Sequence, residues 1–431
     1  MNLLIVVLVM LILLIFGMPV ALIMGLSGIA YFVVTGSFEY FPMAVTRLYS
    51  GIDSFTLICI PFFILAGDMM TRSGITERLV RFSNLLVGRL PGNLAQANVL
   101  ASGIFASISG SALGDIAAIG SVFIPAMKRE GYSGRFTAAV TAASSIVSPI
   151  IPPSLIIILY ASVIDASIGA MFIAAVIPGF MMVAGDMVMV HLLSVKRHYP
   201  RRTKRVPFGE AVKCTRDAMI ALVMPLIIIG GIVGGAFTPT EAAAVAVAYA
   251  FVVGFLIFRN LSLRDIVSAM FDSALSSGKL FFIIACVGIL AWAFAMENVP
   301  QQVVRLFAGM LDKPWLVLLT INVFLLFMGM WLDLTANIFL FAPIFVPLVT
   351  ALGISPLHFS MIFLLNVNLG NITPPLGIVL FATSELSREK AFDIARELGP
   401  FWLIKVFVLA LVTYIPWTSL WLPRLFGFEG S

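Results

Sequence analysis

Long apolar runs dominate this chain, and a few clusters of small and polar residues interrupt them. Runs such as 3–16 and 218–232 contain no charged residue. Segments of this length and uniformity predict membrane-spanning helices rather than the strands of a membrane barrel. Each half of the chain is expected to form two spans, an amphipathic connector, a third span, an interrupted hairpin, a long broken helix and a final span.

These elements have the following predicted bounds. The connectors cover 38–51 and 261–276, the third spans 53–71 and 279–296, the hairpins 92–127 and 314–350, the broken helices 133–163 and 355–385, and the final spans 167–195 and 400–422.

The interruptions recur at a fixed interval. Asp115 and Pro152-Pro153 in the first half match Asn337 and Pro374-Pro375 in the second, each 222 residues later. Paired interrupted segments in two halves of an apolar chain are typical of secondary transporters built from internal repeats. The two predicted repeats cover 1–215 and 216–431.

Basic residues predict how the repeats are oriented. The joining segment Lys196–Arg216 carries the densest cluster of Lys and Arg, so it is expected to be cytoplasmic. The stretches 72–91, 128–135 and 388–396 are expected to lie on the same side. Five crossings in each half would invert the second repeat relative to the first, which gives about ten spans.

Composition supports a membrane protein and excludes several other classes. Hydrophobic residues make up 61% of the chain and charged residues only 11%, whereas soluble domains are about a quarter charged. The net charge of +5 lies largely in short loops, which indicates orientation in a membrane rather than binding to nucleic acid. No nucleotide-binding loop, zinc motif or nucleophile elbow occurs, so nothing indicates an enzyme.

The two interruptions carry the chemistry, and they are called here the first tip (109–115) and the second tip (333–337). Both hold small hydroxyl or amide residues and one carboxylate, at Asp115 and Asp333 respectively. The Pro-Pro pairs are expected to open their helices and free backbone carbonyl groups, which suit a small hard cation. Each acid could bind a cation, join the hydrogen-bond network of its tip, or cap a helix.

Three other acids are interpreted as helix caps. Glu241 follows Thr238-Pro239-Thr240, a pattern typical of a helix start. Asp53 and Asp272 stand where the third spans are predicted to begin.

Four motifs stand in order along the chain: Gly110–Gly120 (GSALGDIAAIG), Ile151–Ser154 (IPPS), Gly235–Ala244 (GAFTPTEAAA) and Asn368–Gly377 (NLGNITPPLG). Together they resemble the large membrane subunit of tripartite ATP-independent periplasmic (TRAP) transporters, over essentially the whole chain. The resemblance implies an all-α polytopic membrane protein with two inverted repeats, re-entrant hairpins and an elevator mechanism.

Carried onto this chain, the resemblance implies sodium sites at the tips and the substrate between them. The implied sodium-site residues are Ser109, Ser111, Asp115, Ser148 and Pro149 in the first half, and Asp333, Thr335, Asn337, Gly370, Asn371 and Thr373 in the second. The candidate substrate-binding residues are Ser111, Asp115, Ser154 and Asp333.

The function expected from this resemblance is sodium-coupled import of a small organic acid across the bacterial inner membrane. The acid would be a C4-dicarboxylate, a sialic acid or another sugar acid, delivered by a periplasmic substrate-binding protein. The expected partners also include a separate small four-helix membrane subunit and membrane lipid, and sodium is expected as the coupling ion with no cofactor. Two alternatives stay open: a self-sufficient anion symporter or exporter of similar architecture, and an intramembrane enzyme acting on lipids.

Overall fold

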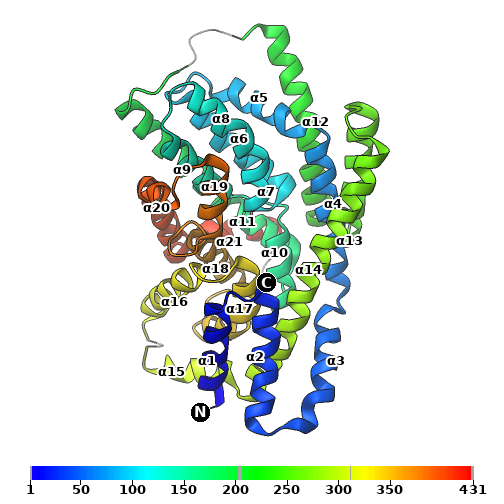
Figure 1. Ribbon diagram of the computed structural model, residues 1–431, viewed down its shortest axis with the longest axis vertical. Coiled ribbons are helices and arrows are strands. Elements are labelled where there is room, and N and C mark those ends of the chain that lie inside the picture. Colours follow the sequence, from blue (N-terminus) through cyan, green and yellow to red (C-terminus); the bar gives the residue numbers. More distant parts are fainter. Residues whose placement is uncertain (1, 202–205, 311, 429–431) are drawn as a thin grey trace.

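The computed structural model describes residues 2–201, 206–310 and 312–428, and helices joined by turns make up this part of the chain (Figure 1). Residues 202–205 of the predicted basic joining segment lie outside the described residues. Within the described ranges, seven helical segments are long and apolar enough to cross a membrane: Phe55–Arg72, Ile168–Lys196, Phe208–Val233, Pro239–Ile257, Leu263–Met296, Leu334–Ala351 and Ala391–Tyr414. The predicted all-α polytopic fold is therefore confirmed.

The helices of the first half are α1 (Asn2–Ile15), α2 (Val20–Thr35), α3 (Phe41–Ile52), α4 (Cys59–Arg72), α5 (Ile75–Val87), α6 (Asn93–Ser109), α7 (Ala112–Asp115), α8 (Ser121–Arg129), α9 (Gly134–Ser145), α10 (Leu155–Ile164) and α11 (Ile168–Lys196). A π-helical turn, η3 (Ile116–Gly120), joins α7 to α8.

The helices of the second half are α12 (Phe208–Val233), α13 (Pro239–Phe251), α14 (Leu263–Met296), α15 (Val299–Leu306), α16 (Pro314–Gly329), α17 (Leu334–Ala351), α18 (Pro356–Gly370), α19 (Ile378–Ser387), α20 (Ala391–Tyr414) and α21 (Trp417–Leu425). Because α12 begins at Phe208, it extends on both sides of the predicted repeat boundary at 215/216.

Both broken helices are interrupted at their Pro-Pro pairs. The first is α9 followed by turns over 146–153 and then α10, and the second is α18 followed by turns and then α19. Proline removes a backbone N–H and clashes with the carbonyl group four residues earlier. Helix α9 accordingly ends at Ser145, four residues before Pro149, and α18 ends at Gly370, four residues before Pro374. Both pairs, Pro152-Pro153 and Pro374-Pro375, have cis peptide bonds.

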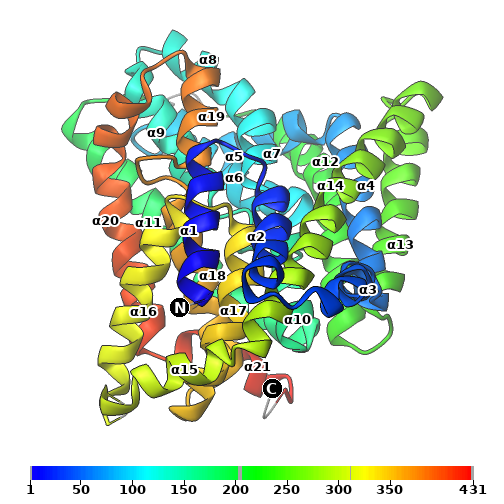
Figure 2. The same cartoon turned by 60° about the horizontal axis from the view of Figure 1, so that its bottom comes forward.

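The helices group into two bodies. The scaffold body consists of α1–α4 and α12–α14, in which α14 packs against α2, α3 and α4, and α13 packs against α4 and α12. The hairpin body consists of α6–α11 and α16–α21. In both views α4, α12 and α13 lie on one side of the molecule, and α9 and α20 lie on the other (Figures 1 and 2). The amphipathic helices α5 and α15 contact both bodies.

One predicted break is wrong. The connector 261–276 and the span 279–296 form a single helix of 34 residues, α14. Asp272 therefore does not begin a span. It lies inside α14, where its carboxylate accepts a hydrogen bond of 2.6 Å from Arg72. The first half does have a break here, because Ser54 adopts an extended conformation between α3 and the turn that leads into α4.

The predicted final span 400–422 also differs from the structure. Helix α20 begins earlier, at Ala391, and ends at Tyr414, and α21 follows as a separate short helix. Pro416 stands between them and lacks the N–H that would continue the helix.

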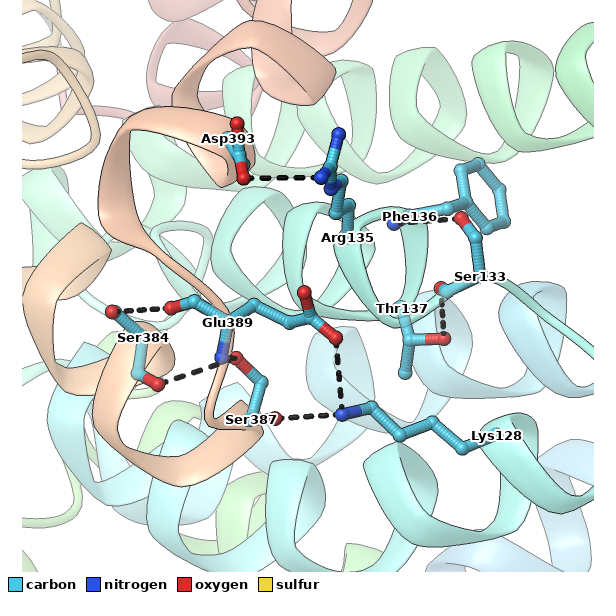
Figure 3. A network of polar contacts seen from close by, with 9 residues as sticks. All are labelled: Lys128, Ser133, Arg135, Phe136, Thr137, Ser384, Ser387, Glu389 and Asp393. Carbon is cyan, nitrogen blue, oxygen red and sulfur yellow. Dashed lines mark hydrogen bonds and ion pairs between the residues drawn. The ribbon is translucent and has the colours of Figure 1, made fainter.

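Ion pairs join the two halves at one end of the hairpin body (Figure 3). The pairs are Lys128–Glu389 at 3.4 Å, Arg135–Asp393 at 3.2 Å and Arg197–Glu397. Lys128 also donates a hydrogen bond of 2.6 Å to the backbone carbonyl group of Ser387. The stretches predicted to be cytoplasmic, 128–135 and 388–396, therefore lie together, as the predicted orientation requires.

Candidate functional site

A cavity of about 740 Å³ lies between the two tips. Residues predicted for the site from both repeats line it: Ser109, Ser111, Pro149, Asp333, Thr335 and Asn371. Residues of α4 and α14 also line it. The structure therefore brings the two distant interruptions of the sequence to one space, at the boundary between the scaffold body and the hairpin body.

The first tip turns sharply at Gly110. Helix α6 ends at Ser109, and Gly110 adopts a left-handed conformation with φ of 56°. A side chain there would come within 3.2 Å of the backbone nitrogen atom of Leu155, so glycine lets the tip approach the start of α10. Ser111 then caps α7, and its hydroxyl accepts a hydrogen bond of 3.2 Å from the backbone N–H of Gly114.

The acid of the first tip lies inside the protein. Asp115 is fully buried, and neither of its carboxylate oxygens has a hydrogen-bond partner within the described part of the chain. The same holds for the hydroxyl of the buried Ser148, which is in the opened part of the broken helix. Buried oxygen atoms without donors are costly. A cation bound beside them would remove that cost, so these residues suit a sodium ion.

The second tip places its acid differently. Asp333 caps α17, and its carboxylate accepts hydrogen bonds from the backbone N–H groups of Thr335 at 3.2 Å and Ala336 at 3.4 Å. Asn337, which matches Asp115 in the repeat, is also fully buried. Its amide donates to the carbonyl groups of Leu332 and Asp333, and its own oxygen has no described partner. Helix capping is thus a property of Asp333, while Asp115 makes no such bond.

The opened part of the second broken helix contributes one further free oxygen. Asn371 lines the cavity, and its side-chain oxygen has no partner among the described residues. Gly370 lies away from the cavity and packs against Gly329 of α16. The hydroxyl of Thr373 donates to the carbonyl group of Leu369 at 2.8 Å and accepts from the indole of Trp402 at 3.1 Å. Thr373 therefore positions α18 against α20.

Several predicted site residues do not line the cavity. Asp115, Ser148, Ser154, Asn337, Gly370 and Thr373 lie behind it. The hydroxyl of Ser154 donates a hydrogen bond of 2.6 Å to the carbonyl group of Pro149, so this side chain supports the first tip from within. Among the four candidate substrate-binding residues, Ser111 and Asp333 alone line the space.

Sequence reasoning missed part of the cavity wall. Asp68 and Thr71 of α4, Lys279 of α14 and Asn368 of α18 also line it. Lys279 had a visible signal, because it is the one charged residue between 273 and 296. Asp68 forms an ion pair of 3.0 Å with Arg72, four residues later. In the sequence this spacing is typical of an ordinary ion pair on a helix surface, so it gave no sign of a site.

Glu241 has the capping role predicted for it. Its carboxylate accepts a 2.8 Å hydrogen bond from the backbone N–H of Thr238, and the Thr238 hydroxyl accepts one from the backbone N–H of Glu241. This reciprocal capping box fixes the start of α13. Glu241 does not line the cavity between the tips.

Comparisons with known proteins agree with this architecture. The family model described as "Tripartite ATP-independent periplasmic transporter, DctM component" matches residues 7–418. The chain is 36% identical over 413 residues to the sialic acid TRAP transporter large permease protein SiaM of Vibrio cholerae, covering 95% of this chain and 96% of that protein. It is 36% identical over 406 residues to the C4-dicarboxylate TRAP transporter large permease protein DctM of Pseudomonas aeruginosa, covering 94% and 95%.

A solved structure supports the fold. The YdaH transporter of Alcanivorax borkumensis, whose crystal structure was described as having an unusual topology, superposes with a TM-score of 0.54 at 15% identity, over 91% of this chain and 89% of that one. The family and its relatives are membrane permeases, which confirms the predictions of a multi-pass inner-membrane transporter and of a protein that is not an enzyme. This chain belongs to the tripartite ATP-independent periplasmic transporter family, as a DctM component.

Proposed function

We propose that this chain imports a small organic acid together with sodium ions, and that a periplasmic binding protein delivers the acid. The observation that carries the proposal is the pair of equivalent tips that face one cavity, each with unpaired buried oxygen atoms in the tip or in the opened helix beside it. These oxygens belong to Asp115 and Ser148 in the first half and to Asn337 and Asn371 in the second.

In this proposal the sodium ions and the acid bind to different groups of the tips. Carboxylate, hydroxyl and amide oxygens behind the tips suit sodium, which would bring the opened helices into a fixed arrangement. The acid then binds in the cavity, where Ser111 and Thr335 offer hydroxyl groups. A loaded hairpin body that slides along the scaffold body would carry both across the membrane, as in an elevator.

Coupling would follow from differential binding. A ligand shifts a conformational equilibrium only by as much as its affinity differs between the two states. Sodium bound at the tips would lower the free energy of the conformation that holds the acid. Movement without sodium would leave the buried oxygen atoms of Asp115 without a partner.

The substrate class rests on the relatives. SiaM and DctM are named for sialic acid and C4-dicarboxylate, which are both small organic acids. The tripartite family name supports a small membrane subunit and a periplasmic binding protein as partners. Large exposed apolar side chains such as Val267, Phe271 and Phe282 of α14 would contact lipid or the small subunit.

Uptake by proteoliposomes tests the proposal. This chain is reconstituted with the small membrane subunit, and radiolabelled succinate, N-acetylneuraminate and glucuronate are offered under an inward sodium gradient. Each acid is offered with and without its binding protein, and a potassium gradient serves as the control.

Uptake of one acid that requires both sodium and the binding protein is the expected result. Uptake without the binding protein would instead indicate the self-sufficient symporter. Uptake that is indifferent to sodium would overturn the coupling mechanism.

A further inference from the structure

Lys279 places a positive charge at the middle of a membrane helix. It stands at the centre of α14, between Leu263 and Met296, and it is the one charged residue of the stretch 273–296. Its side chain is exposed and lines the cavity between the tips. An ionisable side chain on a helix long and apolar enough to cross a membrane generally marks a functional site with a partner.

The charged groups of the cavity leave Lys279 without a partner. Asp68 is held by Arg72, which also binds Asp272. The carboxylate of Asp333 accepts backbone hydrogen bonds at the start of α17. Throughout the described ranges, no hydrogen bond or ion pair involves the ammonium group of Lys279.

We infer that Lys279 is the anion-recognition residue of the cavity, and that it binds the carboxylate of the transported acid. This inference rests on the proposed function and names the group that selects the acid. An ammonium group on a flexible stem acts as a point charge, so it can bind carboxylates of different shapes. Ser111 and Thr335 line the same cavity, and their hydroxyl groups would contact the remainder of the molecule.

The position of Lys279 also links binding to movement. Helix α14 belongs to the scaffold body, whereas both tips belong to the hairpin body. An acid held between Lys279 and the tips therefore spans the two bodies. Lys279 contributes affinity only while the tips face this part of α14, and it releases the acid when the hairpin body moves away.

The test compares three variants of the reconstituted membrane complex: Lys279→Gln, Lys279→Arg and, as a matched control, Lys313→Gln. Lys313 precedes α16 and does not line the cavity. The probe is whichever of succinate, N-acetylneuraminate and glucuronate gives the largest sodium-driven uptake. The measurements are KM, kcat and the sodium concentration for half-maximal uptake.

Lys279→Gln is expected to raise KM at least about tenfold, because a charge-assisted hydrogen bond is lost. Lys279→Arg should keep KM within a few-fold of the wild-type value, since it keeps the charge. Lys313→Gln should have the same KM as the wild type. The half-maximal sodium concentration should stay unchanged in all three, because Lys279 faces the acid. A merely structural role would lower the amount of active protein, and hence kcat, without this change in KM.

A second measurement needs no variant. Thermal stabilisation of the purified wild-type complex, without the binding protein, is compared for the acid and its uncharged amide (for succinate, succinamide) in saturating sodium. The acid should stabilise the complex at a concentration at least about tenfold lower than the amide.

Equal effects of acid and amide, or an unchanged KM in Lys279→Gln, would overturn the role of Lys279. In that case uptake by the wild type would still be sodium-dependent, so the proposed function would stand. Wild-type uptake that is independent of sodium would overturn the proposed function instead.

Discussion

The first tip keeps its acid inside the protein, whereas the second tip uses its acid at the start of a helix. Asp115 is buried with both carboxylate oxygens unpaired, and Ser111 caps the helix in its place. In the second tip Asp333 caps the helix, and the uncharged Asn337 takes the interior position. The two tips therefore have a similar backbone, but the charge stands at the helix cap in one and in the protein interior in the other.

This difference predicts that the two tips do not bind a cation equally. The charge of Asp333 is already stabilised by backbone N–H groups at the N-terminus of α17. Asp115 has no such donors among the described residues, so a cation should contribute more there. We therefore expect sodium dependence to reside mainly in the first tip.

The largest effect is expected at a buried ion pair that joins the two halves within the hairpin body. Lys405 of α20 and Asp186 of α11 form a buried ion pair of 2.8 Å. They lie in the last long helix of each half, 219 residues apart. Lys405→Ala leaves a buried carboxylate without its partner and should lower the free energy of unfolding by about 3–5 kcal/mol.

Thermal unfolding of the purified protein measures this effect. The double variant Asp186→Leu, Lys405→Leu removes both charges and should recover most of the loss, because apolar residues can replace a buried ion pair at little cost. A double variant as unstable as Lys405→Ala would show that packing, rather than charge pairing, joins α11 to α20.

The second prediction compares the acids of the two tips directly. Asp115→Asn removes the charge from the interior of the first tip and should raise the sodium concentration for half-maximal uptake by about tenfold or more. Asp333→Asn should change it far less, because asparagine caps helices about as well as aspartate. Sodium titration of uptake, normalised to folded protein, measures both. Equal losses in the two variants would contradict the asymmetry.

The repeat pattern predicted much of this architecture, since proline pairs and polar interruptions act locally on helices. It identified both hairpins and both broken helices, and the family resemblance supplied the six predicted site residues that line the cavity. It did not predict that α14 is continuous, because Asp272 was interpreted as a cap at the start of a span, whereas it lies inside the helix and pairs with Arg72 of α4. The pairing of Asp186 with Lys405, and the position of Lys279 on the cavity wall, likewise depend on helix packing.

The side-chain roles were harder to predict than the positions. Ser154 looked like a substrate-binding residue, but its hydroxyl bonds to the carbonyl group of Pro149 that the broken helix frees. The two acids stand at different positions of their tips in sequence, but only the structure shows that Asp333 caps a helix while the carboxylate of Asp115 is buried. Composition and spacing do not encode which way a side chain points within a tip.

The third prediction uses backbone packing that differs between the halves. Gly370 approaches the backbone of Gly329 where α18 crosses α16, whereas the matching residues of the first half are Ser148 and Ser107. Gly370→Ala would press a methyl group against that backbone and should destabilise the fold by about 1–3 kcal/mol. Gly399→Ala in α20, where a side chain meets nothing within 4 Å, is the matched control and should be neutral or slightly stabilising. Equal melting temperatures for the two variants would show that the crossing can widen.

The smallest effect is expected at the end of the hairpin body where the surface pair Arg135–Asp393 joins the two halves. The side chain of Arg135 is 59% exposed in its pair with Asp393, whereas that of Lys405 is 2% exposed in its pair with Asp186. Exposed ion pairs contribute little because water and salt screen them. Arg135→Ala should therefore lower the free energy of unfolding by less than about 1 kcal/mol, and the loss should shrink further at high salt. A loss of unfolding free energy as large as that of Lys405→Ala would mean that this surface pair stabilises the contact between the two halves as much as the buried pair does.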